Sequence, residues 1–266
     1  MTRHGSLAGP TLKLRRAKEH LNAFERETSG FFGTDTYRAV REGEMEGSYE
    51  IVRAAVSRGG AVPVAHGLLV GDCLHNLRSA LDHLVFQLAI EHQGRVLSQT
   101  EGQAGSFPIV ADRASRGMPE FLKGKPGRDL KYVSPKAQAV IHALQPCHAR
   151  YPDRTWLAIL GHLDNIDKHR RLLLGGTALG SATWPTDAID VTLNVRGLVK
   201  DGTEIGRIKW RGEPPGPEVD VNDYFSFTVA FREGRPVQVR ATIHILMNIF
   251  VHIRERVFPR FEEFFP

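Results

Sequence analysis

The sequence predicts an α+β protein in which a helical bundle packs with an antiparallel sheet. Apolar residues recur at helical spacing in long stretches near residues 64–92, 153–171 and 240–264. Strand-like segments rich in Thr, Val, Ile and Gly lie within residues 34–57 and 172–239. Because both kinds of element draw on distant parts of the chain, we expect one interwoven domain over residues 1–266. Its helical core would lie mainly in 64–171 and 240–264.

Composition narrows the class of protein. The chain has 266 residues, 41% hydrophobic and 24% charged, which excludes disordered, collagen-like and coiled-coil chains. Two cysteines, Cys73 and Cys147, are too few for a disulfide framework or a four-cysteine zinc site. The formal net charge of +5 permits nucleic-acid binding but does not imply it, because the charge is spread along the chain.

The sequence also predicts where in the cell the protein is located. The first ten residues, MTRHGSLAGP, contain no apolar core of the kind a secretory signal has. No stretch approaches the roughly 18 uncharged apolar residues that a membrane span needs. We therefore expect a cytoplasmic protein that does not enter the membrane.

In the first third of the chain, glycines and prolines separate the elements. Pro10 opens a helix that we expect to run to about Glu27, with Gly30 and Gly33 ending it. A hairpin should follow, with strands in 34–41 and 49–56 and a turn at Gly43–Gly47. The broad apolar stripe of 64–92 predicts a central helix that is buried on most sides.

The remaining elements follow from cap and turn signals. Residues 94–118 read as a long loop with Phe107–Val110 docked on the core. Ser134 and Pro135 should begin a short helix that ends near Leu144, and Asp153 should cap the next helix, which ends near Leu172. Three further strands should cover residues 190–196, 204–211 and 224–232, and Asp201-Gly202 predicts a hairpin turn between the first two. The last helix should then cover residues 240–264.

Two helices carry polar motifs among apolar residues. The first motif is GDCLHNLRSALDHL at 71–84, and the second is LDNIDKHRR at 163–171. Buried polar groups without partners cost about 1–3 kcal/mol each, so these side chains should pair with one another, with backbone or with a ligand. At helical spacing Arg78 faces Asp82 and Asp164 faces Lys168, while Asp167 can meet Arg170 or Arg171.

Helical spacing also aligns His and Asn residues into stripes on three helices. The stripes are Asp72, Asn76, Ser79 and His83; His162, Asn165 and His169; and His244, Asn248 and His252. If the stripes face inward together, they form one polar pocket in the bundle, which is a common place for ligand sites.

The two motifs resemble a broad family of bacterial proteins whose activity is unassigned. The resemblance covers residues from about 49 to 172 and is weaker toward the C-terminus. It implies that the two motifs belong together in space.

A second resemblance, to HEPN-type ribonucleases, comes from the Arg78-x4-His83 spacing. Ser79 departs from the Asn, Asp or His usual after the Arg in that family. The resemblance implies metal-independent RNA cleavage, without a cofactor, at a homodimer interface. His83 would be the general acid or base, and Arg78 would hold the phosphate. The neighbouring polar residues would contact the substrate: His75, Asn76, Asp82, Asn165, Lys168, His169 and Arg170.

Geometry sets a condition on that mechanism. Residues five apart lie about 140° apart around a regular helix, so Arg78 and His83 reach one phosphate only at a distortion or across a dimer axis.

Two other functions remain open. In one, the motifs form a buried structural network in which Arg78 binds Asp164 or Asp167. The protein is then a binding or assembly module that works through the sheet or the 94–118 loop. In the other, Asp72 and His75 act as metal ligands with His162 and His169 on the facing helix, in a metal-dependent enzyme.

Overall fold

The computed structural model confirms the α+β class. The residues it describes are 5–33, 36–46, 48–57, 60–102, 105–170, 172–180, 187–194, 197–216, 221, 225–232 and 241–266. The predicted strand limits at Arg196 and Tyr224 and the predicted contact of Arg171 lie outside these residues. Within them, no helix is both long enough and apolar enough to cross a bilayer.

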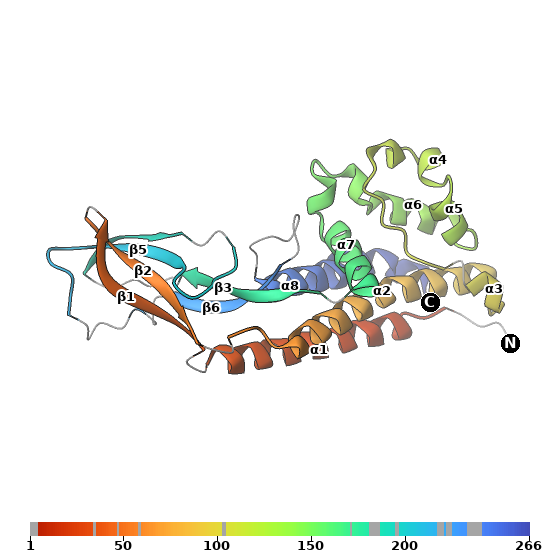
Figure 1. The fold of residues 1–266 in the computed structure, drawn as a ribbon. Helices are drawn as coiled ribbons and strands as arrows, with labels where there is room; N and C mark the ends of the chain where they lie inside the picture. Colours follow the sequence, from red (N-terminus) through yellow and green to blue (C-terminus); the bar gives the residue numbers. More distant parts are fainter. Residues whose placement is uncertain are drawn as a thin grey trace. The chain divides into compact units, whose positions relative to one another are not determined.

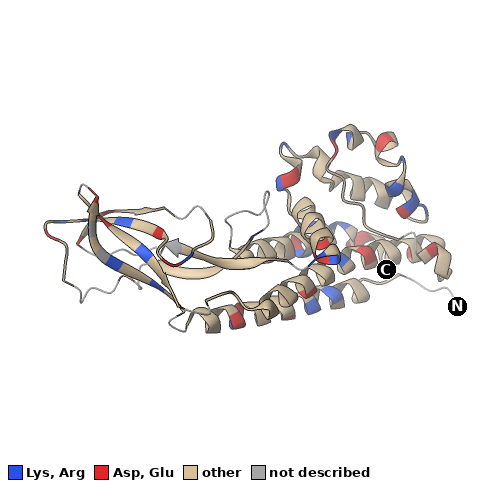
Figure 2. Cartoon of the chain, viewed as in Figure 1, with Lys and Arg blue, Asp and Glu red and all other residues tan. Residues whose placement is uncertain are grey.

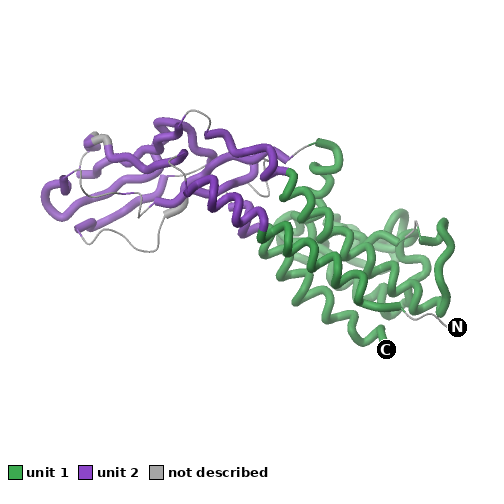
Figure 3. Tube along the Cα trace, turned by 90° about the horizontal axis from the view of Figure 1, so that it is seen from below, with its two compact units in different colours: residues 1–22, 68–171, 246–266 green, residues 23–67, 172–245 purple. Residues whose placement is uncertain are grey.

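The chain divides into two compact units (Figure 3). Unit 1 comprises Met1–Asn22, Leu68–Arg171 and Leu246–Pro266, and unit 2 comprises Ala23–Gly67 and Leu172–Ile245. Each unit is assembled from separated stretches of chain. The expectation of one domain over residues 1–266 stays a prediction.

The core of unit 1 is a set of long helices that lie side by side (Figure 1). They are α1 (Ala8–Phe32, as far as Asn22), α2 (Val64–Gln93, from Leu68) and α8 (Thr242–His252, from Leu246). Lys18 of α1 lies 3.9 Å from the Met247 sulfur and lies over the Phe250 ring, so α1 contacts α8. Leucines of α1 and α2 and isoleucines of the C-terminal segment fill the interior: Leu14, Leu21, Leu74, Leu77, Leu81, Ile249 and Ile253.

Shorter helices complete unit 1. They are α3 (Gln99–Gly102), α4 (Met118–Phe121), α5 (Lys125–Asp129), α6 (Pro135–Ala143) and α7 (Trp156–His169). Short 3-10 turns join them: η1 (Arg113–Arg116), η2 (Pro146–His148) and η3 (Pro152–Arg154). After α8 the chain widens into a π-helical turn, Ile253–Val257, and then tightens into the 3-10 segment Phe258–Phe264.

The described residues of unit 2 form two antiparallel sheets. The four-stranded sheet has the order β1-β2-β5-β4, with β1 (Tyr37–Glu46), β2 (Tyr49–Val56), β4 (Ala188–Leu193) and β5 (Glu204–Trp210). The two-stranded sheet pairs β3 (Leu174–Gly180) with β6 (Phe225–Phe231). One buried cluster takes residues from both sheets, among them Val52, Ile208, Trp210, Ala178 and Phe225. The sheet region is therefore two sheets with a shared core.

Several predicted boundaries are confirmed and others are wrong. The predicted turn between β4 and β5 is present, with Gly202 at φ 74°, a conformation that favours glycine. Gly43 (φ 68°) instead lies within β1, where the register with β2 shifts, so it forms a bulge and not the hairpin turn, while Gly47, the other end of the predicted turn, lies outside the described residues. Thr155, not Asp153, caps α7, because its hydroxyl accepts the Ala158 N–H while Asp153 lies in η3.

Candidate functional site

The two polar motifs lie against each other in unit 1, on α2 and α7. A Cβ built on Gly71 would stand 2.6 Å from a carboxylate oxygen of Asp167, so the missing side chain at Gly71 lets α7 approach α2. Burial and the nearby Asp164 and Asp72 raise the pKa of Asp167. The motifs are therefore neighbours, as the family resemblance implied.

Arg78 and Asp82 hold the backbone of Phe107. Arg78 donates to Asp82 Oδ1 at 2.8 Å and to the Phe107 carbonyl at 2.6 Å. Asp82 Oδ1 in turn accepts the Phe107 N–H at 2.8 Å. The Phe107 side chain is fully buried, which confirms the expected docking of 107–110. Arg78 thus binds within its own helix and to this segment, not to Asp164 or Asp167 as the structural alternative expected.

A pocket of about 560 Å³ opens beside this contact. Its walls come from α2, α5, α7 and residues 106–110. Three acid–base pairs, each within one helix, line it: Arg78–Asp82 at 2.8 Å, Lys125–Asp129 at 2.7 Å and Lys168–Asp164 at 2.6 Å. The pocket therefore combines a charged lining with the apolar side chains of Phe107, Pro108, Ile109 and Val110.

In two of these pairs the acidic side chain is buried and the basic side chain is exposed. The side chains of Asp129 and Asp164 are 10% and 7% exposed, whereas those of Lys125 and Lys168 are 67% and 53% exposed. Burial also raises the pKa of Asp82, against the opposing influence of Arg78 and the Phe107 amide. Among the charged side chains of this pocket, those of the two lysines are therefore the most exposed, while that of Asp82 is 32% exposed.

Four of the predicted site residues line the pocket, namely Arg78, Asp82, Asn165 and Lys168. The other five lie outside its lining. His75, His83, His169 and Arg170 are exposed, and Asn76 donates to the Asp72 carbonyl of its own helix at 2.8 Å. Of the predicted stripe on the last helix, His244 and Asn248 are exposed, and none of its members lines the pocket.

Arg78 and His83, the predicted catalytic pair, are placed differently. Arg78 is turned toward Phe107 and the pocket. His83 lies on the side of α2 that faces α1, where its ring approaches Gly9. Loss of hydration and the positive charge of Lys13 lower the pKa of His83. Within this chain, the two side chains do not face one common point.

The expected metal ligands are not brought together. Among the described residues, the group of three or more His, Cys, Asp or Glu side chains suited to a metal is His142, Cys147 and His148. Asp72, His75, His162 and His169 are not part of it.

Sequence reasoning did not assign a site role to Lys125, Asp129, His142, Cys147 or His148. The HxxxxCH spacing at 142–148 was the available signal for the histidine–cysteine group.

Comparison of the chain with models of protein families, with curated proteins and with solved structures finds no match.

Proposed function

We propose that unit 1 is a binding module that takes a small organic anion, a carboxylate or a phosphate monoester, in the pocket between α2, α5 and α7. The observation that carries this proposal is that two exposed lysines, Lys125 and Lys168, line one pocket. Each of them pairs with a buried aspartate of its own helix. The polar motifs then serve to shape the pocket, so the protein is a binding module, as in the alternative that placed its working surface on the sheet or the 94–118 loop, but it binds in a pocket of which residues 106–110 form only one wall.

The lysines can bind an anion while they keep their own partners. An ammonium group has three N–H donors, and one ion pair uses one of them. Asn165, which is exposed at the same pocket, adds an amide donor. Charge-assisted hydrogen bonds from such groups to a carboxylate or phosphate are about twice as strong as neutral ones.

The remaining lining favours an organic body on the anion. Ile109, Val110 and Pro126 provide apolar contact area next to the lysines. A volume of about 560 Å³ falls in the range of pockets that hold small molecules. Such sites combine apolar walls with a few convergent polar groups, as this one does.

RNA cleavage by Arg78 and His83 is the competing proposal, together with the homodimer that it needs. Arg78 already donates to Asp82 and Phe107, and its side chain is only 13% exposed. A phosphate would have to displace these contacts. This cost favours binding over cleavage as the function. The homodimer and the cytoplasmic location stay predictions.

Calorimetric titration of the full chain with succinate and with glycerol 3-phosphate tests the proposal. The variants are Lys125→Gln and Lys168→Gln. Lys136→Gln is the matched control, because Lys136 is 68% exposed and pairs with Glu263 at 2.7 Å but does not line the pocket. Circular dichroism of each variant checks its fold.

We expect at least one of the two anions to bind, and each pocket variant to weaken that binding about tenfold, which corresponds to about 1.4 kcal/mol. The control should bind as the wild type does. Equal affinity in all three variants, or no binding of either anion, would reject the proposal. RNA cleavage in EDTA that is lost in both Arg78→Ala and His83→Ala would establish the ribonuclease instead.

A further inference from the structure

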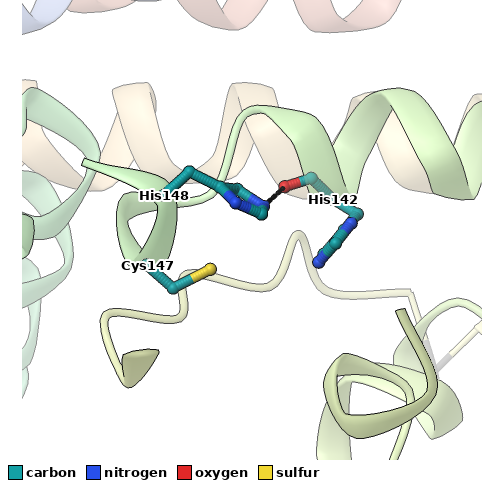
Figure 4. Close-up of side chains that lie close together, drawn as sticks. All are labelled: His142, Cys147 and His148. Carbon is teal, nitrogen blue, oxygen red and sulfur yellow. Dashed lines mark hydrogen bonds between the residues drawn. The ribbon is translucent and has the colours of Figure 1, made fainter. Parts of the chain in front are cut away.

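His142, Cys147 and His148 converge where α6 ends. One candidate ligand atom from each residue, an imidazole nitrogen or the thiol sulfur, lies within 4.8 Å of those of the other two. Figure 4 shows the three side chains gathered beside the turn that joins α6 to η2. The helix ends at Ala143, and Pro146 at the first position of η2 starts a new turn that carries Cys147 and His148 back toward it.

Backbone carbonyls fix the protonation of both imidazoles. His142 Nε2 lies 3.1 Å from the Ser115 carbonyl, and His148 Nε2 lies 3.0 Å from the His142 carbonyl. Because a carbonyl oxygen can only accept, each Nε2 carries a proton, and the neutral ring then has its lone pair on Nδ1. A ring N–H held by a backbone carbonyl is the usual surrounding of a histidine that binds a metal through its other nitrogen.

The rings and the thiol are held in place by packing. The Phe121 ring lies 4.8 Å from the His142 ring, and the His142 and His148 rings meet edge to face at 4.6 Å. Cys147 is fully buried, with its sulfur 3.7 Å from the same Ser115 carbonyl. Arg116 Nε donates to the Cys147 carbonyl at 2.8 Å. The cluster is therefore anchored by residues 115–121 as well as by its own turn.

We propose that His142, Cys147 and His148 bind one Zn²⁺ ion. Thiolate and imidazole are the donors that zinc prefers, whereas magnesium and calcium prefer oxygen. In a tetrahedral zinc site the ligand atoms are about 3.5 Å apart, so the side chains move closer together as the metal binds. As the sulfur–zinc bond forms, the Cys147 thiol gives its proton to solvent.

Three protein ligands leave a fourth position on the metal. In proteins that position is filled by water or substrate, as in zinc sites that perform hydrolysis. His148 is exposed, so solvent reaches the cluster from its side. None of the three residues lines the pocket of the proposed function, so the zinc site is a separate proposal.

Metal loading of the full chain tests the site. The protein is stripped with a chelator, dialysed against Zn²⁺ or Co²⁺, and its bound metal is measured by elemental analysis. The cobalt form reports the ligands, because a thiolate–cobalt bond gives a charge-transfer band in the near ultraviolet. The variants are Cys147→Ala and His148→Ala. The controls are Cys73→Ala, at the other buried cysteine, and His162→Ala, at an exposed histidine of α7.

We expect one equivalent of metal in the wild type and in both controls, and its loss in both variants. At a hundredfold excess of zinc over its dissociation constant, the melting temperature should rise by roughly 5–10 °C. Because His148 is exposed, its variant should fold as the wild type does, which separates metal loss from misfolding. Absence of the cobalt–thiolate band in the wild type, or full zinc retention in Cys147→Ala, would overturn the proposal.

Discussion

Arg41 and Glu50 form a buried ion pair inside unit 2. Arg41 Nε lies 3.0 Å from Glu50 Oε2, and their side chains are 12% and 3% exposed. The same carboxylate oxygen accepts the Trp210 indole N–H at 2.6 Å. Arg41 also donates to the carbonyls of Pro215 and Gly216 and lies over the Trp210 ring. One guanidinium therefore links β1, β2, β5 and the segment that follows β5.

Removing the arginine should destabilise this unit strongly. Arg41→Ala leaves the Glu50 carboxylate buried without its cation, and such losses cost about 3–5 kcal/mol. Urea unfolding followed by tryptophan fluorescence measures the change. Arg207→Ala is the matched control, because Arg207 pairs with Glu46 and Glu204 on the same sheet but is more exposed, and it should lose far less. Similar losses in the two variants would contradict this account.

The buried thiol of Cys73 makes stability depend on pH in the alkaline range. Burial raises the pKa of Cys73 from its ordinary value near 9 to about 12. Between these values the unfolded chain loses the thiol proton and the folded chain keeps it, so the free energy of unfolding falls as pH rises.

The Cys73→Ala variant isolates that contribution. Between about pH 9 and 12, its free energy of unfolding should fall less steeply with pH, by up to about 1.4 kcal/mol per pH unit. Urea titrations at several pH values, compared with the wild type, give the two slopes. Cys147→Ala serves as a comparison at the second cysteine. Parallel slopes in Cys73→Ala and the wild type would show that this thiol does not control alkaline stability.

At the scale of elements, one feature of unit 1 is the docking of residues 105–110 on α2. Residues of α2 hold this segment at Phe107. Gln145 and Cys147, just before and in η2, hold it at Val110. Phe107 binds Arg78 and Asp82, while the Val110 amide donates to Gln145 and its carbonyl accepts the Cys147 N–H. The pocket wall is thus fixed by hydrogen bonds to its backbone, most of them made by side chains of other segments.

Arg78→Ala should release this segment. A hydrogen bond to a charged group contributes about 1.5–3 kcal/mol, so exchange of the Phe107 amide should accelerate by about ten- to a hundredfold. Hydrogen exchange followed by mass spectrometry or NMR measures the rate. Asn76→Ala is the control, because Asn76 bonds only within its own helix turn and should leave the rate unchanged. An unchanged rate in Arg78→Ala would show that burial of Phe107 and its bond to Asp82 hold the segment without the arginine.

The long helices could be predicted from the sequence because their evidence is local. Apolar spacing gave the extent of α2, and the Ser134 hydroxyl caps α6 as expected by accepting the Ala137 N–H. The short helices α4 and α5 were missed, since four or five residues show no periodicity. The pairing of β3 with β6 was missed because its glycines resemble a loop and its partner lies about fifty residues away.

Only the part of the candidate site that has a local sequence signal could be predicted. The pairs Arg78–Asp82 and Asp164–Lys168 are separated by four residues, so helical spacing reveals them. No local sequence pattern indicates that Lys125 and Asp129 line the same pocket, because their position depends on how distant segments fold together. The position of His83 opposite α1 depends likewise on which face of α2 each neighbour covers.

At the scale of the whole molecule, the net charge of +5 is not gathered into one element. Figure 2 shows Lys and Arg interspersed with Asp and Glu on the helices of unit 1 and on the strands of unit 2. Long-range attraction of a polyanion needs a concentrated field of one sign. In the pocket, three basic side chains stand beside three acidic ones, so binding there depends on short-range hydrogen bonds from the lysines, which suits a small anion better than a long nucleic acid.

The order in which the two units use the chain constrains how the protein is made. The polypeptide passes from unit 1 to unit 2 and back twice, and residues 246–266, which belong to unit 1, are translated after the last stretch of unit 2. The helical unit therefore cannot be completed on the ribosome until the stretch that includes both sheets has emerged. About 150 residues separate the end of α2 from this last stretch, and at roughly 5–20 residues per second their synthesis takes about 8–30 s.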